Sequence, residues 1–562
     1  MVKEIVRQAI REAIEAVRAS GELSFEEMPE FSVERPPKED LGDFATNAPM
    51  ILARPAKRNP RDIAALVIEN LRLPNNMLGK AEVAGGGFIN VHLNPNWLWA
   101  AIREAHECDQ DYGRSDIGGG ARVQVEFVSA NPTGPLHVGN ARGGVIGDVI
   151  ANLLEFIGFD VEREYYVNDV TESTQVQRFG ESLEARYMQL HGHDVPIPED
   201  GYKGAYVSDI AQELVEESGK HYVNMKSEKR AEAFAKFARE RILERQKKAL
   251  VEFGIKFDNW VAEQWLYDSG RVAGLIERLT ESGFTYEAEG ALWLSTTKFG
   301  DYKDEVLVRR TGVPTYYASD IAYHLYKVER GYKFAIDVWG ADHHGHIMRT
   351  KTVLSALGVD SDWLNVILYQ FVRLYRGGEV VAMGKREGEF VTLEDLLEWV
   401  PKDAARYFLL MRSADTHLDF DVDLAVQQTS DNPVYYIQYV HARCRAIFRQ
   451  AMEQEHLGLE MVRVERAAVD LSLLTHVAER RLMREIAECA DEVQTAAAMR
   501  APHRLTTYSH RLADAFHRFY TDCRVLEDDA ALSAARLVLV EAAQITVRNV
   551  LALMGVSAPE QM

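Results

Sequence analysis

The chain is poor in cysteine and has no uninterrupted apolar run long enough to span a membrane. Its first residues, MVKEIVRQAIREAIEAV, alternate charged and apolar residues at helical spacing, so they predict neither a secretory signal nor a membrane anchor. We therefore expect no membrane partner. The cysteines lie far apart without a CxxC pair, which argues against a zinc cluster or a disulfide framework and favours a reducing, cytoplasmic location; they are Cys108, Cys444, Cys489 and Cys523.

Positive charge is also scarce. The 64 Lys and Arg residues face 86 Asp and Glu residues, and the net charge of −22 argues against a protein that coats DNA without sequence specificity. One stretch differs, because residues 226–248 carry nine basic residues against four acidic ones. Two interpretations fit that stretch: a solvated helix face, or a contact with an RNA backbone.

The length of 562 residues and a hydrophobic content of 47% predict about three or four folded units. Residues 1–115 open with an amphipathic helix and close on the alternating pattern GFINVHL, which predicts a small α/β domain. Beyond residue 400 there is almost no strand pattern. Residues 401–562 are therefore predicted to form an all-α helical bundle, with an apolar stripe made of Leu505, Tyr508, Leu512, Phe516 and Phe519.

Residues 116–400 carry the pattern of a Rossmann-type α/β domain. VQVEFVSA predicts a strand, NPTGPL a turn, the following residues a helix that ends at Gly158, and VEREYYVND a second strand. This order predicts a parallel sheet with a ligand crevice at the carboxyl ends of its strands. Residues from about 172 to 295 are mostly helical and are predicted to be an insertion, after which ALWLST, VLVRR, YKFAIDVWG and WLNVILYQFV are expected to complete the sheet.

Two short motifs indicate phosphate chemistry. HVGN, residues 137–140, stands at a strand-to-helix turn, where glycines and a helix N-terminus favour a phosphate. VVAMGKREGEF, residues 380–390, contains a glycine-flanked basic loop suited to covering a polyphosphate. Alone, the first is typical of a helix cap and the second of a solvated turn. Their occurrence in one chain favours nucleotide binding.

HVGN is similar to the HIGH motif, and AMGKR to the KMSKS motif, of class I aminoacyl-tRNA synthetases. More narrowly, the chain resembles the arginyl-tRNA synthetases in blocks that follow the family order over nearly its whole length: VEFVSANPTGPLHVGNARGGVIGD, YYVND, TYYASDIAYH, GADHHGH, DAARYFLL and DNPVYYIQYVHAR. The resemblance implies an arginine–tRNA ligase that activates L-arginine with ATP to arginyl-adenylate and transfers it to the 3′ end of tRNA(Arg). It also implies Mg²⁺ brought by the nucleotide, no structural metal, an N-terminal tRNA-binding domain, a C-terminal anticodon-binding domain and an activation step that needs tRNA.

In the family pattern His137 and Lys385 are catalytic, because they stabilise charge on ATP while the arginine carboxylate attacks the α-phosphorus. Three positions depart from the family motifs: Asn140, Ala382 and Gly384. The implied ATP-binding residues are His137, Gly139, Asn140, Gly340, Asp342, Met383 and Lys385. The HIGH-type motif comprises Asn131, Pro132, Thr133, Gly134, Pro135, Leu136, His137, Val138, Gly139 and Asn140.

Recognition of arginine calls for acids that face a guanidinium group. Glu126 lies in an apolar strand, where a carboxylate needs a partner, whereas Tyr316 and Asp320 are four residues apart and also fit an ordinary helix-face pair. The histidines of GADHHGH fit a metal site too, but they crowd one loop without a distant fourth ligand, and we predict no metal. The resemblance assigns arginine binding to Glu126, Ser129, Asn131, Tyr316, Asp320 and His343.

The resemblance also implies contacts with tRNA. Phe44 and Asn47 of GDFATN stand where a base could be stacked and hydrogen-bonded, although a core phenylalanine and a turn cap fit equally well. In the bundle, Tyr435, Arg443 and Tyr520 are candidates for contacts with unstacked anticodon bases. Two rival functions are a class I synthetase for another amino acid and a catalytically silent tRNA-binding paralogue. We expect a monomer that does not bind DNA.

Overall fold

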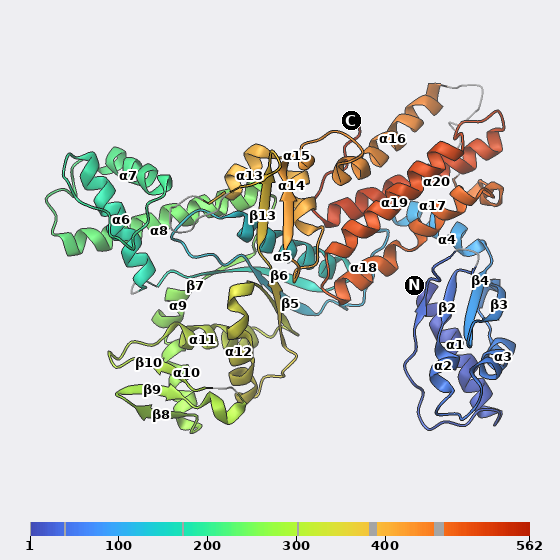
Figure 1. The fold of residues 1–562 in the computed structure, drawn as a ribbon, viewed down its shortest axis with the longest axis horizontal. Helices are drawn as coiled ribbons and strands as arrows, with labels where there is room; N and C mark the ends of the chain where they lie inside the picture. Colours follow the sequence, from blue (N-terminus) through green and yellow to red (C-terminus); the bar gives the residue numbers. More distant parts are fainter. Residues whose placement is uncertain (1, 39–40, 171–172, 301–302, 382–389, 454–465) are drawn as a thin grey trace.

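The computed structural model describes residues 2–38, 41–170, 173–300, 303–381, 390–453 and 466–562. A central parallel sheet lies between a helical C-terminal bundle and a projecting helical unit, and the N-terminal unit forms a separate lobe below the bundle (Figure 1). The predicted fold class, a multidomain α/β protein with a Rossmann-type core and an all-α C-terminal part, is confirmed.

The N-terminal lobe is a four-stranded antiparallel sheet, in the order β1-β2-β4-β3, packed against helices. The alternation in GFINVHL places Ile89 and Val91 in the core at 0% exposure, as predicted. The next helix, α4 (Asn96–Cys108), leaves this lobe and packs against the C-terminal bundle. The elements of the lobe are α1 (Val2–Ala19), β1 (Val33–Glu34), β2 (Phe44–Thr46), α2 (Ala48–Leu52), α3 (Pro60–Asn70), β3 (Leu78–Ala84) and β4 (Phe88–Leu93).

The two tRNA candidates in this lobe have different surroundings. Phe44 lies in β2 and is 8% exposed, so its ring fills the core and offers no face for a base. The side-chain oxygen of Asn47 accepts a hydrogen bond from the backbone N–H of Ser32 at 2.9 Å, which ties two segments of the lobe together. Phe44 therefore takes the core position that fitted its sequence, whereas the side chain of Asn47 makes no cap hydrogen bond and instead links two segments of the lobe.

The central sheet has the order β12-β11-β5-β6-β7, and every neighbouring pair is parallel. The unit β5–α5–β6 matches the predicted βαβ motif. Helix α5 lies against the sheet because Gly147 lets it approach closely: a Cβ there would stand 2.3 Å from the ring of Phe127. The elements are β5 (Arg122–Phe127), α5 (Val138–Phe156), β6 (Asp160–Val167), β7 (Asn259–Ala262), β11 (Ala335–Gly340) and β12 (Leu364–Tyr369).

The predicted insertion at 172–295 is wrong in its extent. The helical unit ends with its third helix, after which the short strand β7 joins the edge of the central sheet. A strand of four residues between helices has too little periodicity to be recognised in the sequence. The unit has its own apolar core and consists of α6 (Thr174–Leu190), α7 (Ala205–Ser218) and α8 (Ser227–Glu252).

ALWLST and VLVRR do not complete the central sheet as predicted. They contribute β9 and β10 to a separate antiparallel sheet in which β8 and β9 form a hairpin. Its two-residue turn, Glu289 and Gly290, has positive φ at both positions, a geometry that favours a tight hairpin over a crossover to a parallel strand. This lobe contains α9 (Glu263–Asp268), α10 (Arg271–Glu281), β8 (Thr285–Ala288), β9 (Ala291–Leu294), β10 (Glu305–Val308), α11 (Tyr316–Glu329) and α12 (His344–Ala356).

The basic stretch 226–248 lies on α8, and several of its arginines bind acids within the protein. Arg230 is buried and pairs with Glu184 at 2.6 Å, while Arg245 pairs with Glu394 at 2.7 Å. Arg241 pairs with acidic residues of both α7 and α8. Much of the local positive charge therefore stabilises the helical unit, which favours the structural interpretation over an RNA contact.

The C-terminal part begins with a small sheet, β14-β13-β15, and continues as a helical bundle. The predicted stripe on α19, from Leu505 to Phe519, is fully buried. Among the described residues one helix, α20, is long and apolar enough to cross a membrane, but 67% of its apolar window is buried in the bundle. The elements are β13 (Val372–Arg376), β14 (Glu379–Val380), α13 (Leu393–Trp399), α14 (Lys402–Leu410), β15 (Leu418–Asp421), α15 (Val422–Ala425), α16 (Pro433–Glu453), α17 (Val477–Ala487), α18 (Cys489–Ala498), α19 (His503–Asp522) and α20 (Ala530–Leu553).

Candidate active site

The HVGN motif forms the N-terminus of α5, directly beyond the carboxyl end of β5. His137 is the N-cap: its Nδ1 accepts from the backbone N–H of Asn140 at 3.2 Å, and the Asn140 side-chain oxygen accepts from the His137 N–H at 3.1 Å. Because Nδ1 is an acceptor, a neutral ring carries its proton on Nε2, which makes Nε2 a donor. Gly139 is needed beside this ring, since a Cβ there would lie 2.9 Å from two of its atoms.

The chain that follows the second nucleotide motif lies against this turn, although more than two hundred residues separate the two. Met383, Lys385, Ala382 and Gly384 lie outside the described residues, but the chain from Phe390 onward pairs with the turn. Leu393 N–H donates to Leu136 O at 2.7 Å, and Val138 N–H donates to Val391 O at 3.2 Å. The rings of His137 and Phe390 meet edge to face at a centroid distance of 6.3 Å. The residues from Phe390 to Leu393 are therefore anchored next to the HVGN turn.

Tyr369, which the sequence analysis missed, connects HVGN with the GADHHGH segment. It ends β12, and its hydroxyl hydrogen-bonds with the side chain of Asn140. Its ring occupies the space above Gly143, where a Cβ would lie 2.5 Å from a ring carbon of Tyr369. Asn140 thus has defined partners despite its departure from the family motif.

Gly340, at the end of β11, lies near the Tyr369 hydroxyl. A Cβ on Gly340 would stand 2.6 Å from a carboxylate oxygen of Asp342, so this glycine allows the side chain of Asp342 to fold back over the end of β11.

Glu126 has the buried partner that its position demanded. It is 5% exposed, its Oε2 lies 2.5 Å from Nζ of Lys327, and its Oε1 accepts from the Ser129 hydroxyl at 2.8 Å. Lys327 also donates to Asp337 at 2.8 Å, and His324 Nε2 lies 2.8 Å from the other oxygen of Asp337. The cation is necessary because Glu126 and Asp337 are direct neighbours on the parallel strands β5 and β11.

The electrostatics of this group follow from burial and from the shared cation. Burial raises the pKa of Glu126, although Lys327 opposes the effect. Burial acts in the same direction on Asp337, but Lys327 and His324 outweigh it and hold the pKa of Asp337 below its usual value. Lys327 and His324 were not predicted, yet with Asp320 they recur at helical spacing on one face of α11, a polar stripe that the sequence DIAYHLYK contains.

Asp320 is half-buried on the same face and has no ion-pair or hydrogen-bond partner for its carboxylate among the described residues. Burial raises its pKa to about 7, and the acids Glu263, Glu126 and Asp337 add to the rise while His324 opposes it. Near it, Glu263 accepts a hydrogen bond from Ser319 at 2.6 Å. A guanidinium group would supply the cation that Asp320 lacks.

The backbone that leads from Glu126 to the turn is strained. Val128 and Ser129 have φ values of 69° and 38°, a left-handed conformation that is rare for a β-branched residue. Two neighbours hold Ser129 there: Tyr166 N–H donates to its hydroxyl at 3.1 Å, and the Asn168 amide donates to its carbonyl at 3.2 Å. Such strain typically costs about 1–3 kcal/mol per residue and is found mostly at functional sites.

The remaining predicted pocket residues differ in their surroundings. Tyr316 begins α11 and is 62% exposed, so one ring face is accessible for stacking. His343 is exposed and lies 3.9 Å from Asp342. The side-chain amide of Asn131 donates to the side-chain oxygen of Gln175 on α6 at 3.0 Å, so Asn131 contacts the helical unit. Within the described ranges no three His, Cys, Asp or Glu side chains are grouped as a metal site.

Comparison with known families identifies the chain. Three family models match it in succession: the arginyl tRNA synthetase N terminal domain over residues 2–93, the catalytic domain of tRNA synthetases class I (R) over 108–423, and the DALR anticodon binding domain over 437–562. The arginine–tRNA ligase of Moorella thermoacetica is 50% identical over 560 residues, covering 100% of this chain and 99% of that protein. The chain belongs to the arginyl-tRNA synthetases.

Further relatives agree with this assignment. The arginine–tRNA ligase of Heliobacterium modesticaldum is 47% identical over 561 residues, covering 100% of this chain and 99% of that protein. The structure of Thermus thermophilus arginyl-tRNA synthetase has the same fold, with a TM-score of 0.77, 23% identity and 100% coverage of both chains.

In this arginyl-tRNA synthetase the bundle candidates for tRNA contacts lie together on α16 and α19. The Arg443 guanidinium lies over the rings of Tyr439 and Tyr520, 5.0 and 5.1 Å from their centroids. Tyr435 stacks on Tyr439 at 6.4 Å, and Tyr520 is 38% exposed. The structure thus unites the three predicted residues and adds Tyr439, which the sequence analysis missed although it stands one helical turn after Tyr435.

Proposed function

We propose that this arginyl-tRNA synthetase activates L-arginine at the carboxyl edge of the central sheet and then charges tRNA(Arg). An oxygen of the arginine carboxylate attacks the α-phosphorus of ATP, the bond to the β-phosphate oxygen breaks, and pyrophosphate leaves. A ribose hydroxyl of the terminal adenosine of the tRNA then attacks the arginyl carbonyl, and AMP leaves. The observation that carries the proposal is the carboxylate of Asp320 on α11, for which the described part of the chain supplies no partner, on a helix that lines the same sheet edge as the His137 turn.

His137 and Lys385 are the proposed catalytic residues. The Nε2 proton of His137 would stabilise charge on the phosphates at the N-terminus of α5, where the helix dipole also favours an anion. Gly139 and Asn140 keep that turn in place, and Met383 and Lys385 would cover the nucleotide. Gly340 and Asp342 would bind the adenylate ribose. Mg²⁺ would arrive with ATP and neutralise phosphate charge, since it is commonly held through substrate phosphates.

The arginine pocket is proposed to consist of an acid pair, a stacking ring and polar positioning groups. Asp320 would pair with the guanidinium, and the exposed ring of Tyr316 would stack on it. Glu126, already compensated by Lys327, adds a second acid. Ser129, Asn131 and His343 would bind the rest of the substrate.

We further propose that each domain has its own role. Residues 1–115 would bind tRNA, 116–400 would carry out the chemistry, and 401–562 would bind the anticodon through Tyr435, Arg443 and Tyr520. We also propose that the enzyme acts in the cytoplasm as a monomer, without membrane or DNA partners.

Pyrophosphate exchange tests the reaction. Exchange that depends on arginine is expected, and comparing reactions with and without tRNA shows whether activation needs tRNA. Exchange with another amino acid would support the rival class I specificity. The silent-paralogue alternative is tested by Lys385→Ala, which should abolish most exchange while tRNA affinity changes little; a silent binder would have no exchange to lose.

A further inference from the structure

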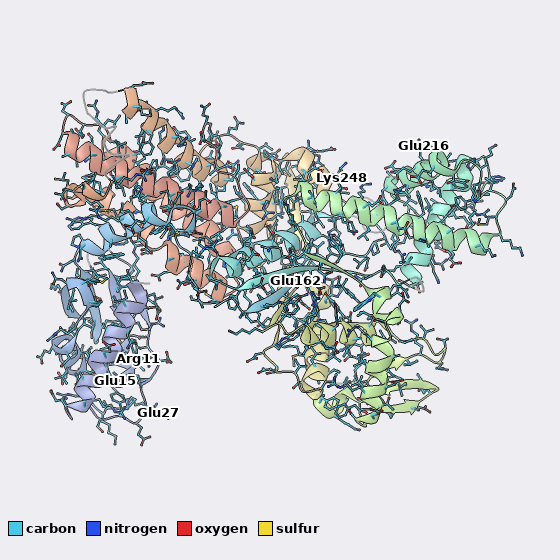
Figure 2. The ribbon with its side chains drawn as sticks, turned by 180° about the vertical axis from the view of Figure 1, so that it is seen from behind. Arg11, Glu15, Glu27, Glu162, Glu216 and Lys248 are labelled. Atoms are coloured by element: carbon cyan, nitrogen blue, oxygen red, sulfur yellow. The ribbon has the colours of Figure 1, made fainter. Side chains whose placement is uncertain are left out.

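Helix α8 connects the outer helical unit with the catalytic sheet. Figure 2 shows Glu216 of α7 within the projecting part of this unit and Lys248 of α8 closer to the central domain. Gln246, two residues before Lys248, is 1% exposed. A buried amide needs all of its hydrogen bonds satisfied, so the partners of Gln246 indicate what this end of α8 holds.

Those partners are backbone carbonyls of the turn that precedes His137. The Gln246 amide donates to Gly134 O at 2.8 Å and to Asn131 O at 3.2 Å. Its oxygen lies 3.0 Å from the hydroxyl of Tyr165, which in turn accepts from the Ala130 N–H at 3.0 Å. One side chain of α8 therefore fixes both ends of the turn.

A second residue of the helical unit holds the same turn. The hydroxyl of Tyr206, on α7, donates to Thr133 O at 2.9 Å. The segment 130–134 belongs to no helix or strand, so its backbone carbonyls have no partners in regular secondary structure. The turn that sets the position of His137 is thus held by side chains of the helical unit and of β6.

The same helical unit also contacts the segment that follows the second nucleotide motif. Arg245, the residue before Gln246, pairs with Glu394 of α13 at 2.7 Å. Phe390 packs against the apolar core of the unit, which includes Tyr206, and against the ring of His137. The helical unit therefore contacts both the HVGN turn and the chain from Phe390 onward.

We propose that Gln246 is a positioning residue for adenylate formation, and that with Tyr206 it makes the helical unit a clamp on the HVGN turn. The inference rests on the proposed function. Helix α8 should affect kcat because it holds the turn that positions His137. A displacement of about 1 Å in a catalytic group can lower the rate about 100-fold. Gln246 and Tyr206 act through the turn and contact no substrate in this proposal.

Three variants test it in arginine-dependent pyrophosphate exchange. Gln246→Met keeps the size of the side chain but removes both donors, and kcat should fall about 100-fold while the KM for arginine changes by less than about threefold. Tyr206→Phe removes one hydroxyl, and kcat should fall about fivefold. Gln189→Met is the matched control: Gln189 donates to Val195 O at 2.7 Å inside the helical unit and does not touch the turn. It should lower the thermal midpoint less than Gln246→Met does, because Gln189 is half-buried and donates one hydrogen bond to a backbone carbonyl where Gln246 donates two, and it should leave kcat within about twofold.

The proposal is overturned if Gln246→Met retains the kcat of the unaltered enzyme, or if Gln189→Met loses as much. If Gln246→Met fails to fold, Tyr206→Phe alone tests the proposal, because the loss of one oxygen does not disturb packing. In that case an unchanged kcat of Tyr206→Phe refutes the clamp. Unaltered enzyme that shows no arginine-dependent exchange even with tRNA(Arg) present refutes the proposed function instead, so the two failures are distinguishable.

Discussion

Lowering the pH should weaken arginine binding through Asp320. Burial and the nearby acids raise the pKa of this carboxyl to about 7, so a proton occupies it in part at neutral pH. Only the ionised form can pair with a guanidinium group, and the KM for arginine should therefore rise as pH falls. If the protonated form does not bind, KM scales with 1 + 10^(7−pH), which gives an increase of about tenfold between pH 8 and pH 6.

The assay is initial aminoacylation rate against arginine concentration between pH 6 and pH 8.5, with the KM for ATP measured in parallel. The comparison variant is Asp320→Asn, which keeps the shape of the side chain but cannot ionise. It should raise the KM for arginine about 10- to 100-fold, as expected for the loss of a charge-assisted hydrogen bond, and that KM should no longer change with pH.

Two results would refute the reasoning. A KM for arginine that stays flat from pH 6 to pH 8 in the unaltered enzyme would show that Asp320 is already ionised or is not a ligand. A pH dependence that persists in Asp320→Asn would assign the titration to another group, such as Glu263, whose pKa burial also raises.

Three further predictions follow from single contacts. Gly139→Ala places a Cβ 2.9 Å from the ring of His137 and should lower kcat in pyrophosphate exchange about 100-fold, whereas Gly274→Ala, where nothing lies within 4 Å, should leave it unchanged. Lys327→Met leaves two buried carboxylates without their cation and should lower the free energy of unfolding by about 3–5 kcal/mol in urea titrations. Arg443→Ala should raise the KM for tRNA about tenfold without changing kcat at saturating tRNA, and an unchanged KM would remove the α16–α19 surface from the proposed interface.

The sequence predicted those features whose signal is local. The β5–α5–β6 unit was recognisable because a strand, a glycine-rich turn and a long apolar helix follow one another directly. The position of His137 at the start of that helix followed from the same pattern, and the family resemblance added its chemical role.

Features that depend on distant residues escaped sequence reasoning. The need of Glu126 for a partner was clear from its apolar strand, but the partner, Lys327, lies 201 positions later and meets it only when α11 packs on the sheet. Phe44 fitted a core position and a stacking position equally, because burial is a property of the folded lobe. Strand β7 is too short to show a period. In each case the missing information was which residues lie next to one another in the folded chain.

The two pocket acids should respond differently to neutralisation, because only one of them has an internal cation. Glu126 shares Lys327 with Asp337, so Glu126→Gln should raise the KM for arginine and lower the free energy of unfolding together. Asp320 has a raised pKa, so keeping its carboxyl in the fold opposes folding once the unfolded chain ionises: this cost is absent below the unfolded pKa near 3.8, grows as pH rises from there to about 7, and is complete above that. Asp320→Asn should accordingly raise the KM while stabilising the arginine-free enzyme at pH 8, with a clearly smaller stabilisation at pH 5. Urea titrations at the two pH values measure this, and an Asp320→Asn variant that is less stable at pH 8 would mean that the carboxylate has an internal partner and is not held ready for a substrate cation.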